Sequence, residues 1–477
     1  MQLPSLPQKT TLSLQTKGET PYFSYWVNPV IYQADNKNSN VILISIDTLR
    51  ADHLGCYGYP RDTSPHIDSL AQEGTLFLHS FSTSPWTLPS HVSIMTSLFG
   101  VHHQVYTSKQ KMSPSLLTLA DVLRKNHFFN SGFTGGGFVS AQYGFAKGFD
   151  VYHEGRGGVF HMNSAELIYK SFSNWLESNK GKRFFLFLHT YQPHNPYVCP
   201  HPHNTRFLEE NPKWEHLNLL GYLGGKSGIY KKLSESEKEN AVGLYDGEIH
   251  YLDQHLIGPL AAKLKEMDLF DDTMIILTSD HGEEFFDHGA WDHGHSLYNE
   301  SIRVPLVIKF PHQKFRGQTI TSTVSLVDIM PTVLEEMNIP ASDIILDGQS
   351  LFPLLKGKKT KDRMFFADIK GNVLNSHIPQ KSSINQGKYK LILNQEFRQQ
   401  DLDFFTDPPL NIPQIELYDL VNDIRETNNI AGQNPSLTQA LVQKINTLVS
   451  QAKKRRPGET EIDEKLREQL KALGYIR

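Results

Sequence analysis

Short apolar runs closed by polar residues recur along the first two thirds of the chain. The clearest cover residues 41–46, 184–188, 274–278 and 305–310. Runs of about five apolar residues are typical of strands that are buried on both faces of a parallel sheet. We therefore expect these four segments to form central strands of one large sheet.

Segments with helical spacing of apolar residues lie between these runs. The spacing predicts helices near residues 64–73, over residues 116–123 and over residues 237–265, with a glycine turn at residues 135–137. Strands that alternate with helices are typical of a doubly wound sheet. The sequence thus predicts an α/β fold in which helices sandwich a large, mostly parallel sheet.

The apolar runs become shorter after about residue 345. Residues 387–392 and 417–420 are typical of a small antiparallel sheet, and residues 437–452 of a helix that closes it. Residues 462–473 predict a final helix that ends at Gly474. The expected parts are an N-terminal extension (1–39), a main domain (40–345), a smaller C-terminal α+β subdomain with the antiparallel sheet (346–452) and a tail helix (453–477).

Composition excludes several classes of protein. The chain has 477 residues, of which 39% are hydrophobic, which is typical of a globular protein and excludes disordered and fibrous classes. Its 47 basic and 51 acidic side chains leave a net charge of -4, which gives no field that would gather nucleic acid. We therefore expect no nucleic-acid partner, and we interpret the basic run at residues 453–456 as a solvated tail.

Membrane segments, export signals and cysteine sites are also not indicated. The sequence has no apolar run long enough for a membrane span, and its first 40 residues lack the apolar core of a signal peptide. We expect a soluble protein, located in the cytoplasm if the sequence is full length. The two cysteines, Cys56 and Cys199, are too few for a disulfide framework and do not form a metal-binding or redox pair.

Polar residues with metal-binding chemistry follow two of the predicted strands. Asp47 comes directly after residues 41–46, and Asp280 and His281 come just after residues 274–278. Open α/β sheets place their sites at the carboxyl ends of the strands, so these side chains are expected to share one divalent cation. The alternative for each aspartate is that it only caps the helix that follows its strand.

The segment Thr87-Leu-Pro-Ser-His91 resembles the nucleophile motif of sulfatases, Cys/Ser-x-Pro-Ser-Arg. Thr87 occupies the position of the nucleophile in this motif, and His91 occupies the position of the arginine. Further matches follow in the family's order, over roughly residues 40 to 430, and the chain is similar to the sulfatase-like branch of the alkaline phosphatase superfamily. The matching segments are Ile46-Asp-Thr-Leu-Arg-Ala-Asp-His-Leu-Gly55, Pro193-His-Asn-Pro196, Tyr245-Asp-Gly-Glu-Ile249, Asp280-His-Gly282, Ile302-Arg-Val-Pro305, Ser325-Leu-Val-Asp-Ile-Met-Pro-Thr332, Asp347-Gly-Gln-Ser-Leu351 and Glu416-Leu-Tyr-Asp-Leu420.

The resemblance implies a catalytic domain at residues 40–345 and a hydrolase that cleaves ester bonds. Asp47, Asp280 and His281 would hold a divalent metal with Thr87, whose hydroxyl would attack the ester and form a covalent intermediate. Sulfatases attack with the hydrated aldehyde of formylglycine, which has a second hydroxyl to expel sulfate, and threonine lacks that hydroxyl. The departure favours a phospho-ester substrate, a diester, monoester or phosphonate monoester, over a sulfuric ester.

Several histidines are candidates for contacts with the substrate. The resemblance implies a substrate-side role for His194, a role on the transferred group for His103, and protonation of the leaving group by His295, although the local alignment could equally place His293 there. For His91 a catalytic role and a supporting hydrogen bond remain open. Other histidines are expected to be bystanders, because the chain has 22.

The ligand set leaves the metal open between Mn²⁺, Zn²⁺, Mg²⁺ and Ca²⁺. His281 adds a nitrogen ligand, and Thr48 replaces the second acid of the family's Asp-Asp pair, so calcium is less favoured. A possible second metal would use Asp246 and His250, four apart on a predicted helix, with His293 or His295 as a third ligand. A site with one metal is the default interpretation.

Three alternatives to a phospho-ester hydrolase remain. The first is a sulfuric ester hydrolase of the arylsulfatase type. The second is a phosphotransferase, although the relatives that use threonine in this way are anchored by transmembrane helices, which this sequence does not predict. The third is a binding protein of the same fold without catalysis. In each enzymatic case the expected partner is a small-molecule ester.

Overall fold

The structure is a computed structural model that describes residues 39–155, 163–209, 233–358, 363–370, 380–395, 412–452 and 456–472. The N-terminal extension predicted for residues 1–39 lies outside this part of the chain, apart from Ser39.

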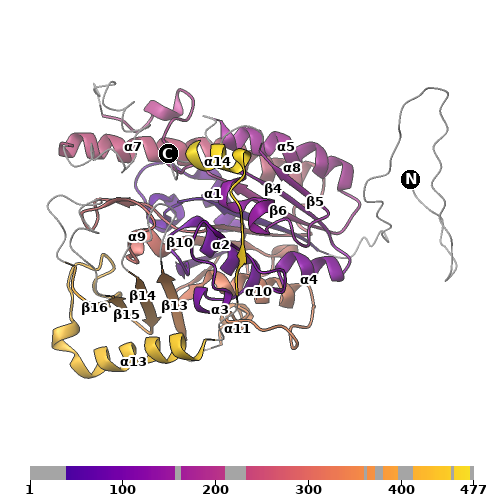
Figure 1. Ribbon diagram of the computed structural model, residues 1–477. Helices are drawn as coiled ribbons and strands as arrows, with labels where there is room; N and C mark the ends of the chain where they lie inside the picture. The colour runs from indigo at the N-terminus through magenta and orange to yellow at the C-terminus, as the bar shows by residue number, and fades with distance from the viewer. Residues whose placement is uncertain are drawn as a thin grey trace, which may run out of the picture. The chain divides into compact units, whose positions relative to one another are not determined.

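A large sheet of nine strands forms the centre of the described chain (Figure 1). Neighbouring strands run parallel except at β10, which is antiparallel to both β2 and β7. The predicted α/β fold with a mostly parallel sheet is therefore confirmed. In sheet order the strands are β11 (Gln318–Ile320), β2 (Thr75–Phe81), β10 (Arg303–Lys309), β7 (Thr273–Ser279), β1 (Asn40–Ile46), β6 (Phe184–Thr190), β4 (Phe129–Thr134) and β5 (Val151–Glu154), with β12 (Val324–Ser325) also paired to β2.

Helices cover both faces of this sheet, because its central strands are apolar on both sides. In β1, Val41 and Leu43 belong to one buried cluster, whereas Ile42 and Ile44 belong to the cluster on the other face. Each fully buried aliphatic side chain of this kind contributes roughly 1.5–3 kcal/mol. One face carries α2 (Thr87–Thr96), α4 (Leu119–Lys125) and α10 (Ile329–Glu336), and the other α1 (Pro65–Glu73), α5 (Ser164–Asn179), α7 (Glu235–Leu252) and α8 (Gly258–Glu266) (Figure 1).

The long helix predicted over residues 237–265 is interrupted near its middle. A π-helical turn, η8 (Asp253–Ile257), joins α7 to α8. Pro259 lies in the first turn of α8, and proline has no N–H to donate and its ring clashes with the carbonyl four residues earlier, so the ladder of hydrogen bonds changes here. The turn directs Asp253 at the start of α1, where its carboxylate accepts hydrogen bonds from the backbone N–H groups of His66 and Ile67.

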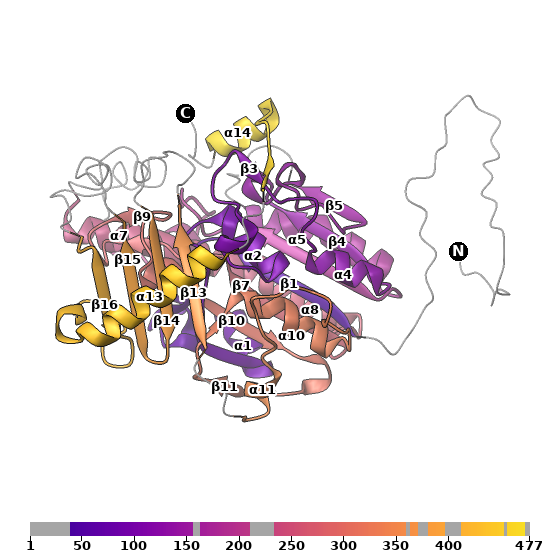
Figure 2. The ribbon, with the colours of Figure 1, turned by 60° about the horizontal axis from the view of Figure 1, so that its bottom comes forward.

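A second, smaller sheet follows in the chain, as predicted. Its four strands are antiparallel, and α13 (Pro435–Gln451) crosses one face of it (Figure 2). Leu441 and Ile445 of α13 are buried in one cluster with Ile384 and Leu391. The predicted boundary at residue 345 stays a prediction. The strands are β13 (Met364–Ile369), β14 (Lys381–Gln386), β15 (Tyr389–Asn394) and β16 (Ile415–Asp419).

The last described segment returns to the large domain. β17 (Gly458–Glu459) pairs with β3 (Gln110–Lys111), and α14 (Glu464–Ala472) follows (Figure 2). Leu466 and Leu470 of α14 are buried in the core. Gln469 Oε1 of α14 accepts a hydrogen bond of 3.1 Å from the backbone N–H of Gly137. A tail helix is therefore present, and the predicted cap at Gly474 lies outside the described residues.

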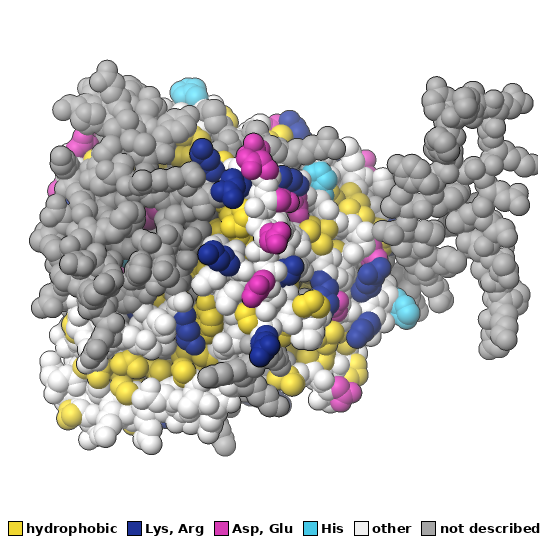
Figure 3. Space-filling view, in the orientation of Figure 1, with side chains coloured by type: hydrophobic (Ala, Val, Ile, Leu, Met, Phe, Trp, Pro, Cys, Tyr) yellow, Lys and Arg dark blue, Asp and Glu magenta, His cyan; other side chains and the backbone are white. Residues whose placement is uncertain are grey.

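Among the described residues, no helix combines the length and the apolar character that crossing a bilayer requires. On the face seen in Figure 3, basic and acidic side chains are interspersed.

Candidate functional site

Three of the predicted metal ligands lie at the carboxyl ends of two adjacent strands, β7 and β1. Ile46 at the end of β1 is in register with Ser279 of β7 and with Thr190 of β6. The residues that follow β1 and β7, Asp47 and Asp280, therefore emerge side by side. Thr87 is the first residue of α2 and is buried against the same strand ends.

Asp47, Asp280 and His281 form a compact, fully buried cluster. Their ligand atoms all lie within 4.8 Å of one another. His281 Nε2 is 3.4 Å from Asp280 Oδ2 and 3.6 Å from Asp47 Oδ1. Thr87 Oγ1 is 3.3 Å from Asp47 Oδ2 and 3.4 Å from His281 Nε2. The fold thus brings together all four residues that the sequence predicts as ligands.

The donor set fits a divalent cation. Asp47 Oδ1 and Asp280 Oδ2 are buried without a hydrogen-bond partner among the described residues, and an unpaired buried carboxylate oxygen is costly. The backbone carbonyl of Gly282 accepts the Nδ1–H of His281 at 2.8 Å, so the lone pair of Nε2 faces the cluster. Two carboxylate oxygens and one imidazole nitrogen beside a hydroxyl form a candidate metal centre.

Burial shifts the pKa values of all three groups in the cluster, and the two carboxylates also affect each other. Burial raises the pKa of Asp280 well above its ordinary value, and the neighbouring Asp47 raises it further. Burial also raises the pKa of Asp47 and lowers that of His281. A bound cation would favour two ionised carboxylates and a neutral imidazole, which are the forms that bind metal.

His91 ties the backbone of Thr87 to β1. Its Nδ1–H donates to the carbonyl oxygen of Thr87 at 2.9 Å, and its Nε2 accepts from Ser45 Oγ at 2.9 Å. Burial, and then the neighbouring His189, lower the pKa of His91 to about 3, so the ring is neutral. These contacts are those of a group that positions the start of α2, and a catalytic role for His91 stays a prediction.

His189 lies beside Asp47, and the sequence did not single it out. It is the next-to-last residue of β6, in register with Ser45 of β1, and it is fully buried. Its Nε2 is 3.6 Å from Asp47 Oδ2. Burial lowers its pKa to about 3. His189 directly follows the apolar run at residues 184–188, as Asp47 follows the run at residues 41–46. Polar residues at the carboxyl ends of parallel strands mark sites, so the same signal could have identified His189.

A group of histidines and acids borders the cluster next to His281. His293 Nδ1 lies 3.1 Å from Glu283 Oε1 and 2.9 Å from Asp292 Oδ1, and its ring centroid is 4.5 Å from that of His281 and 4.9 Å from that of His194. Burial lowers the pKa of His293, but the two carboxylates outweigh burial and raise it well above the ordinary value. His194 and His293 therefore both border the candidate metal centre, and the sequence did not identify Glu283 and Asp292.

The other two predicted histidines have contacts of a different kind. His295 Nε2 bonds to Glu284 Oε2 at 2.9 Å, so of the two alternatives it is His293, not His295, that packs against the predicted ligand His281. His103 accepts from the backbone N–H of Val105 at 3.0 Å, and its Nε2 lies 3.1 Å from Ser93 Oγ. Roles for His103 and His295 in catalysis stay predictions.

The structure does not assemble the possible second metal site. Asp246 is occupied by His53, Tyr59 and Arg61, whose polar atoms lie 2.6–2.8 Å from its carboxylate oxygens. His250 instead pairs with His203, with 2.7 Å between the Nδ1 atoms. Asp246 and His250 share α7, but their side chains contact different residues, and His293 lies with Glu283 and Asp292, a group that could itself hold a metal ion.

Thr48 turns the chain directly after Asp47. Its φ of 57° lies in the left-handed region, which is unusual for a β-branched residue, and its Oγ1 is buried without a hydrogen-bond partner among the described residues. Strained conformations of this kind cost about 1–3 kcal/mol and cluster at functional sites. This strained conformation lies directly after Asp47, which is consistent with a backbone conformation that is required to place the Asp47 carboxylate in the cluster.

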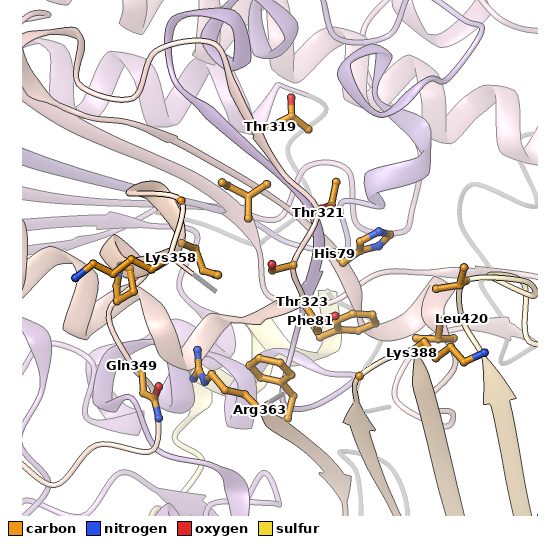
Figure 4. Close-up of a pocket in the computed structure, with 18 of the residues that line it drawn as sticks. His79, Phe81, Thr319, Thr321, Thr323, Gln349, Lys358, Arg363, Lys388 and Leu420 are labelled. Carbon is orange, nitrogen blue, oxygen red and sulfur yellow. The ribbon is translucent and has the colours of Figure 1, made fainter. Parts of the chain in front are cut away.

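A cavity of about 620 Å³ lies elsewhere, between the edge of the large sheet and the small sheet. Its lining includes His79, Phe81, Arg363 and Lys388 (Figure 4). None of the predicted site residues lines it, so its chemistry is separate from that of the candidate metal centre.

Comparisons with known proteins agree with this fold. The phosphonate monoester hydrolase of Agrobacterium radiobacter superposes with a TM-score of 0.68 at 21% identity, covering 89% of this chain and 100% of that chain. Arylsulfatase K of Canis lupus familiaris is 25% identical over 462 residues, which cover 87% of this chain and 83% of the relative. The multifunctional alkaline phosphatase superfamily protein PehA of Trinickia caryophylli is 26% identical over 478 residues, which cover 82% and 91%.

Family models match most of the chain. The model described as N-sulphoglucosamine sulphohydrolase, C-terminal, matches residues 286–455. The sulfatase model matches residues 39–339, which include all four predicted metal ligands. The chain therefore belongs to the sulfatase family of ester hydrolases.

Proposed function

We propose that the protein hydrolyses a small-molecule phospho-ester, a diester, monoester or phosphonate monoester, through a covalent intermediate on Thr87. The observation that carries the proposal is the position of Thr87 Oγ1, 3.3 Å from Asp47 Oδ2 and 3.4 Å from His281 Nε2. A hydroxyl that only supported the fold would not need two predicted metal ligands as its neighbours.

The identity of the nucleophile favours phosphorus over sulfur. Threonine Cβ has only one oxygen, so a sulfated threonine has no second hydroxyl on that carbon to expel sulfate by collapse to a carbonyl group. A phosphothreonine can instead be hydrolysed by a second in-line displacement at phosphorus. The N-terminus of α2 supports an anionic reacting group beside Thr87, because it carries a partial positive charge and unpaired backbone N–H groups.

In the first step Thr87 Oγ attacks phosphorus and the ester oxygen leaves. The hydroxyl of Thr87 points at Asp47 Oδ2, the nearest acceptor for its proton. His91 holds the carbonyl of Thr87, so the start of α2 keeps its position during the attack. A bond forms between Thr87 Oγ and phosphorus as the bond from phosphorus to the leaving oxygen breaks.

The leaving oxygen needs a proton, and His293 is the candidate donor. Glu283 and Asp292 lie 3.1 and 2.9 Å from its Nδ1, and its ring packs against that of His281. His194 packs against this ring and donates its Nδ1–H to the carbonyl of Asn195. In the second step water attacks phosphorus and gives a proton to His293, the bond from phosphorus to Thr87 Oγ breaks, and Asp47 returns the proton to the threonine hydroxyl.

Asp47, Asp280, His281 and Thr87 would hold the cation. A divalent cation supplies Lewis acidity that lowers the pKa of the threonine hydroxyl and offsets the charge of the transferred group. One nitrogen among oxygen donors favours Mn²⁺, Zn²⁺ or Mg²⁺ over Ca²⁺.

A sulfuric ester is the second candidate substrate. It is favoured by the curated relatives named arylsulfatase K, which match 87% of this chain. Turnover would then require water to attack the sulfur of a threonine sulfate.

The test compares an aryl phosphate, a bis-aryl phosphate, an aryl phosphonate monoester and an aryl sulfate as substrates. The full chain, Thr87→Ala and Thr87→Ser are mixed with each ester, quenched in acid and analysed by peptide mass mapping. We expect a phosphoryl adduct on Thr87, which Thr87→Ser retains on its new hydroxyl. Turnover by Thr87→Ala should fall by at least about a thousandfold.

Thr96→Ala is the matched control, because Thr96 lies on the same helix and, among the described residues, its hydroxyl bonds only to the carbonyl of Val92. Full turnover by Thr87→Ala without any adduct on the parent would refute covalent catalysis by this residue. Turnover of the aryl sulfate alone would assign the second candidate instead.

A further inference from the structure

His189 is a fully buried histidine whose two ring nitrogens have no hydrogen-bond partner among the described residues. Buried polar groups are normally paired, and each unpaired one lowers stability. An imidazole left in this state beside a functional site therefore requires an explanation from the chemistry of the site.

Its neighbours fix the direction of the ring. His91 and Tyr191 pack edge to face against it, with centroids 4.9 and 4.7 Å away. Gly135 closes the side of Nδ1, where a Cβ would lie 3.8 Å from that atom and 2.6 Å from the ring of Tyr191. With Nδ1 on the glycine side, Nε2 faces Asp47 Oδ2 at 3.6 Å.

The two oxygens of Asp47 have different surroundings. Oδ2 accepts from Thr87 and faces His189. Oδ1 has no hydrogen-bond partner within the described ranges and lies 3.6 Å from His281 Nε2. A partial rotation of the carboxylate would move Oδ1 away from His281 Nε2 and disturb the candidate metal centre. A donor on the side of Oδ2 would prevent that rotation.

We propose that His189 is a positioning residue that directs an Nε2–H at Asp47 Oδ2 and so keeps Oδ1 aimed at the cation. The inference rests on the metal centre of the proposed function. His189 acts through Asp47 and is not itself a ligand, because the ligand atoms that lie within 4.8 Å of one another come from Asp47, Asp280 and His281. Outer groups of this kind typically change metal affinity about 10- to 100-fold.

The test measures metal binding without substrate. The full chain is stripped with EDTA, and the dissociation constants for Mn²⁺ and Zn²⁺ are measured by calorimetry for the parent and its variants. We expect His189→Leu, which fills the space but cannot donate, to bind about 10- to 100-fold more weakly. His189→Gln, whose amide nitrogen reaches about as far as Nε2, should stay within a few-fold of the parent.

Two further measurements separate positioning from a structural role. His189→Leu should melt at the same or a higher temperature than the parent in EDTA, because it removes an unpaired polar group from the interior. Tyr191→Phe is the matched control: it loses hydrogen bonds to Gly136 and Phe138 but keeps the ring beside His189. We expect it to melt at a lower temperature with unchanged metal affinity.

Parent-like affinity in His189→Leu, or equally weak binding in folded His189→Gln, would overturn the inference. So would X-ray absorption of the zinc-loaded parent that shows two imidazoles on the metal, since only His281 is expected. Asp47→Asn distinguishes the underlying proposal. If it also binds metal like the parent, the metal centre itself is wrong, whereas loss of binding in Asp47→Asn but not in His189→Leu refutes only the role of His189.

Discussion

The imidazole rings of His281 and His293 pack against each other with centroids 4.5 Å apart. One ring belongs to the candidate metal centre, and the other is held by Glu283 and Asp292. The contact places a possible proton donor next to the site of attack without making it a ligand.

We expect His293→Ala to lower kcat about 10²- to 10⁴-fold for esters of alkyl alcohols, which leave poorly. The loss should be much smaller for 4-nitrophenyl esters, because nitrophenolate leaves without a proton. Steady-state kinetics across a series of leaving groups measures the difference. His295→Ala is the control, since His295 bonds to Glu284, and an equal loss for all leaving groups in His293→Ala would contradict proton donation.

Asp280→Asn should stabilise the metal-free protein and abolish its response to metal. The change removes one of two buried neighbouring carboxylates. The side-chain oxygen of the new asparagine can still accept the hydrogen bond from the backbone N–H of His281. We expect a gain of roughly 1–3 kcal/mol in EDTA. Saturating Mn²⁺ should raise the melting temperature of the parent only, because ligands stabilise the state that binds them. An equal rise in Asp280→Asn would exclude Asp280 as a ligand.

Thr48→Asp should increase affinity for Ca²⁺ relative to Mn²⁺. It restores the second acid of the family's Asp-Asp pair at a buried position whose hydroxyl has no partner among the described residues. A further carboxylate oxygen suits a hard cation, and we expect a gain on the order of tenfold. Thr48→Asn is the control, because asparagine tolerates the positive φ and adds no charge. Equal calcium affinities in the two variants, measured by competition, would refute the prediction.

Glu248 should make stability depend on pH. Burial raises its pKa from 4.5 to about 7, although Gln192 and the N–H of Cys199 donate to it. Because the folded pKa lies above the unfolded one, its contribution is full below pH 4.5 and is lost as pH rises through about 7. The loss is on the order of 3 kcal/mol. Urea unfolding in EDTA between pH 5 and 9 should show a flatter dependence for Glu248→Gln, and parallel curves would contradict this.

The sequence predicted the fold and the cluster of ligands for the same reason. Apolar runs identify buried strands, and in a parallel sheet the residues after neighbouring strands emerge together, so Asp47 and Asp280 could be placed without coordinates. The direction of β10 could not be predicted, because an apolar run reads alike in parallel and antiparallel strands.

Partners from distant loops were the part that the sequence could not supply. Helical spacing placed Asp246 and His250 on one face but did not show that the segment around Tyr59 and Arg61 would occupy the carboxylate. The unpaired state of His189 is likewise a property of its packing. His293 and His295 are two residues apart, and only the fold determines which of them meets His281.

The contact between Gln469 of α14 and Gly137 joins the end of the described chain to the glycine turn beside Tyr191. During translation Thr87, Asp280 and the turn all leave the ribosome before Gln469 does. The turn therefore acquires this partner only after α14 has been made, and a nascent chain that ends before α14 lacks the contact between Gln469 and Gly137.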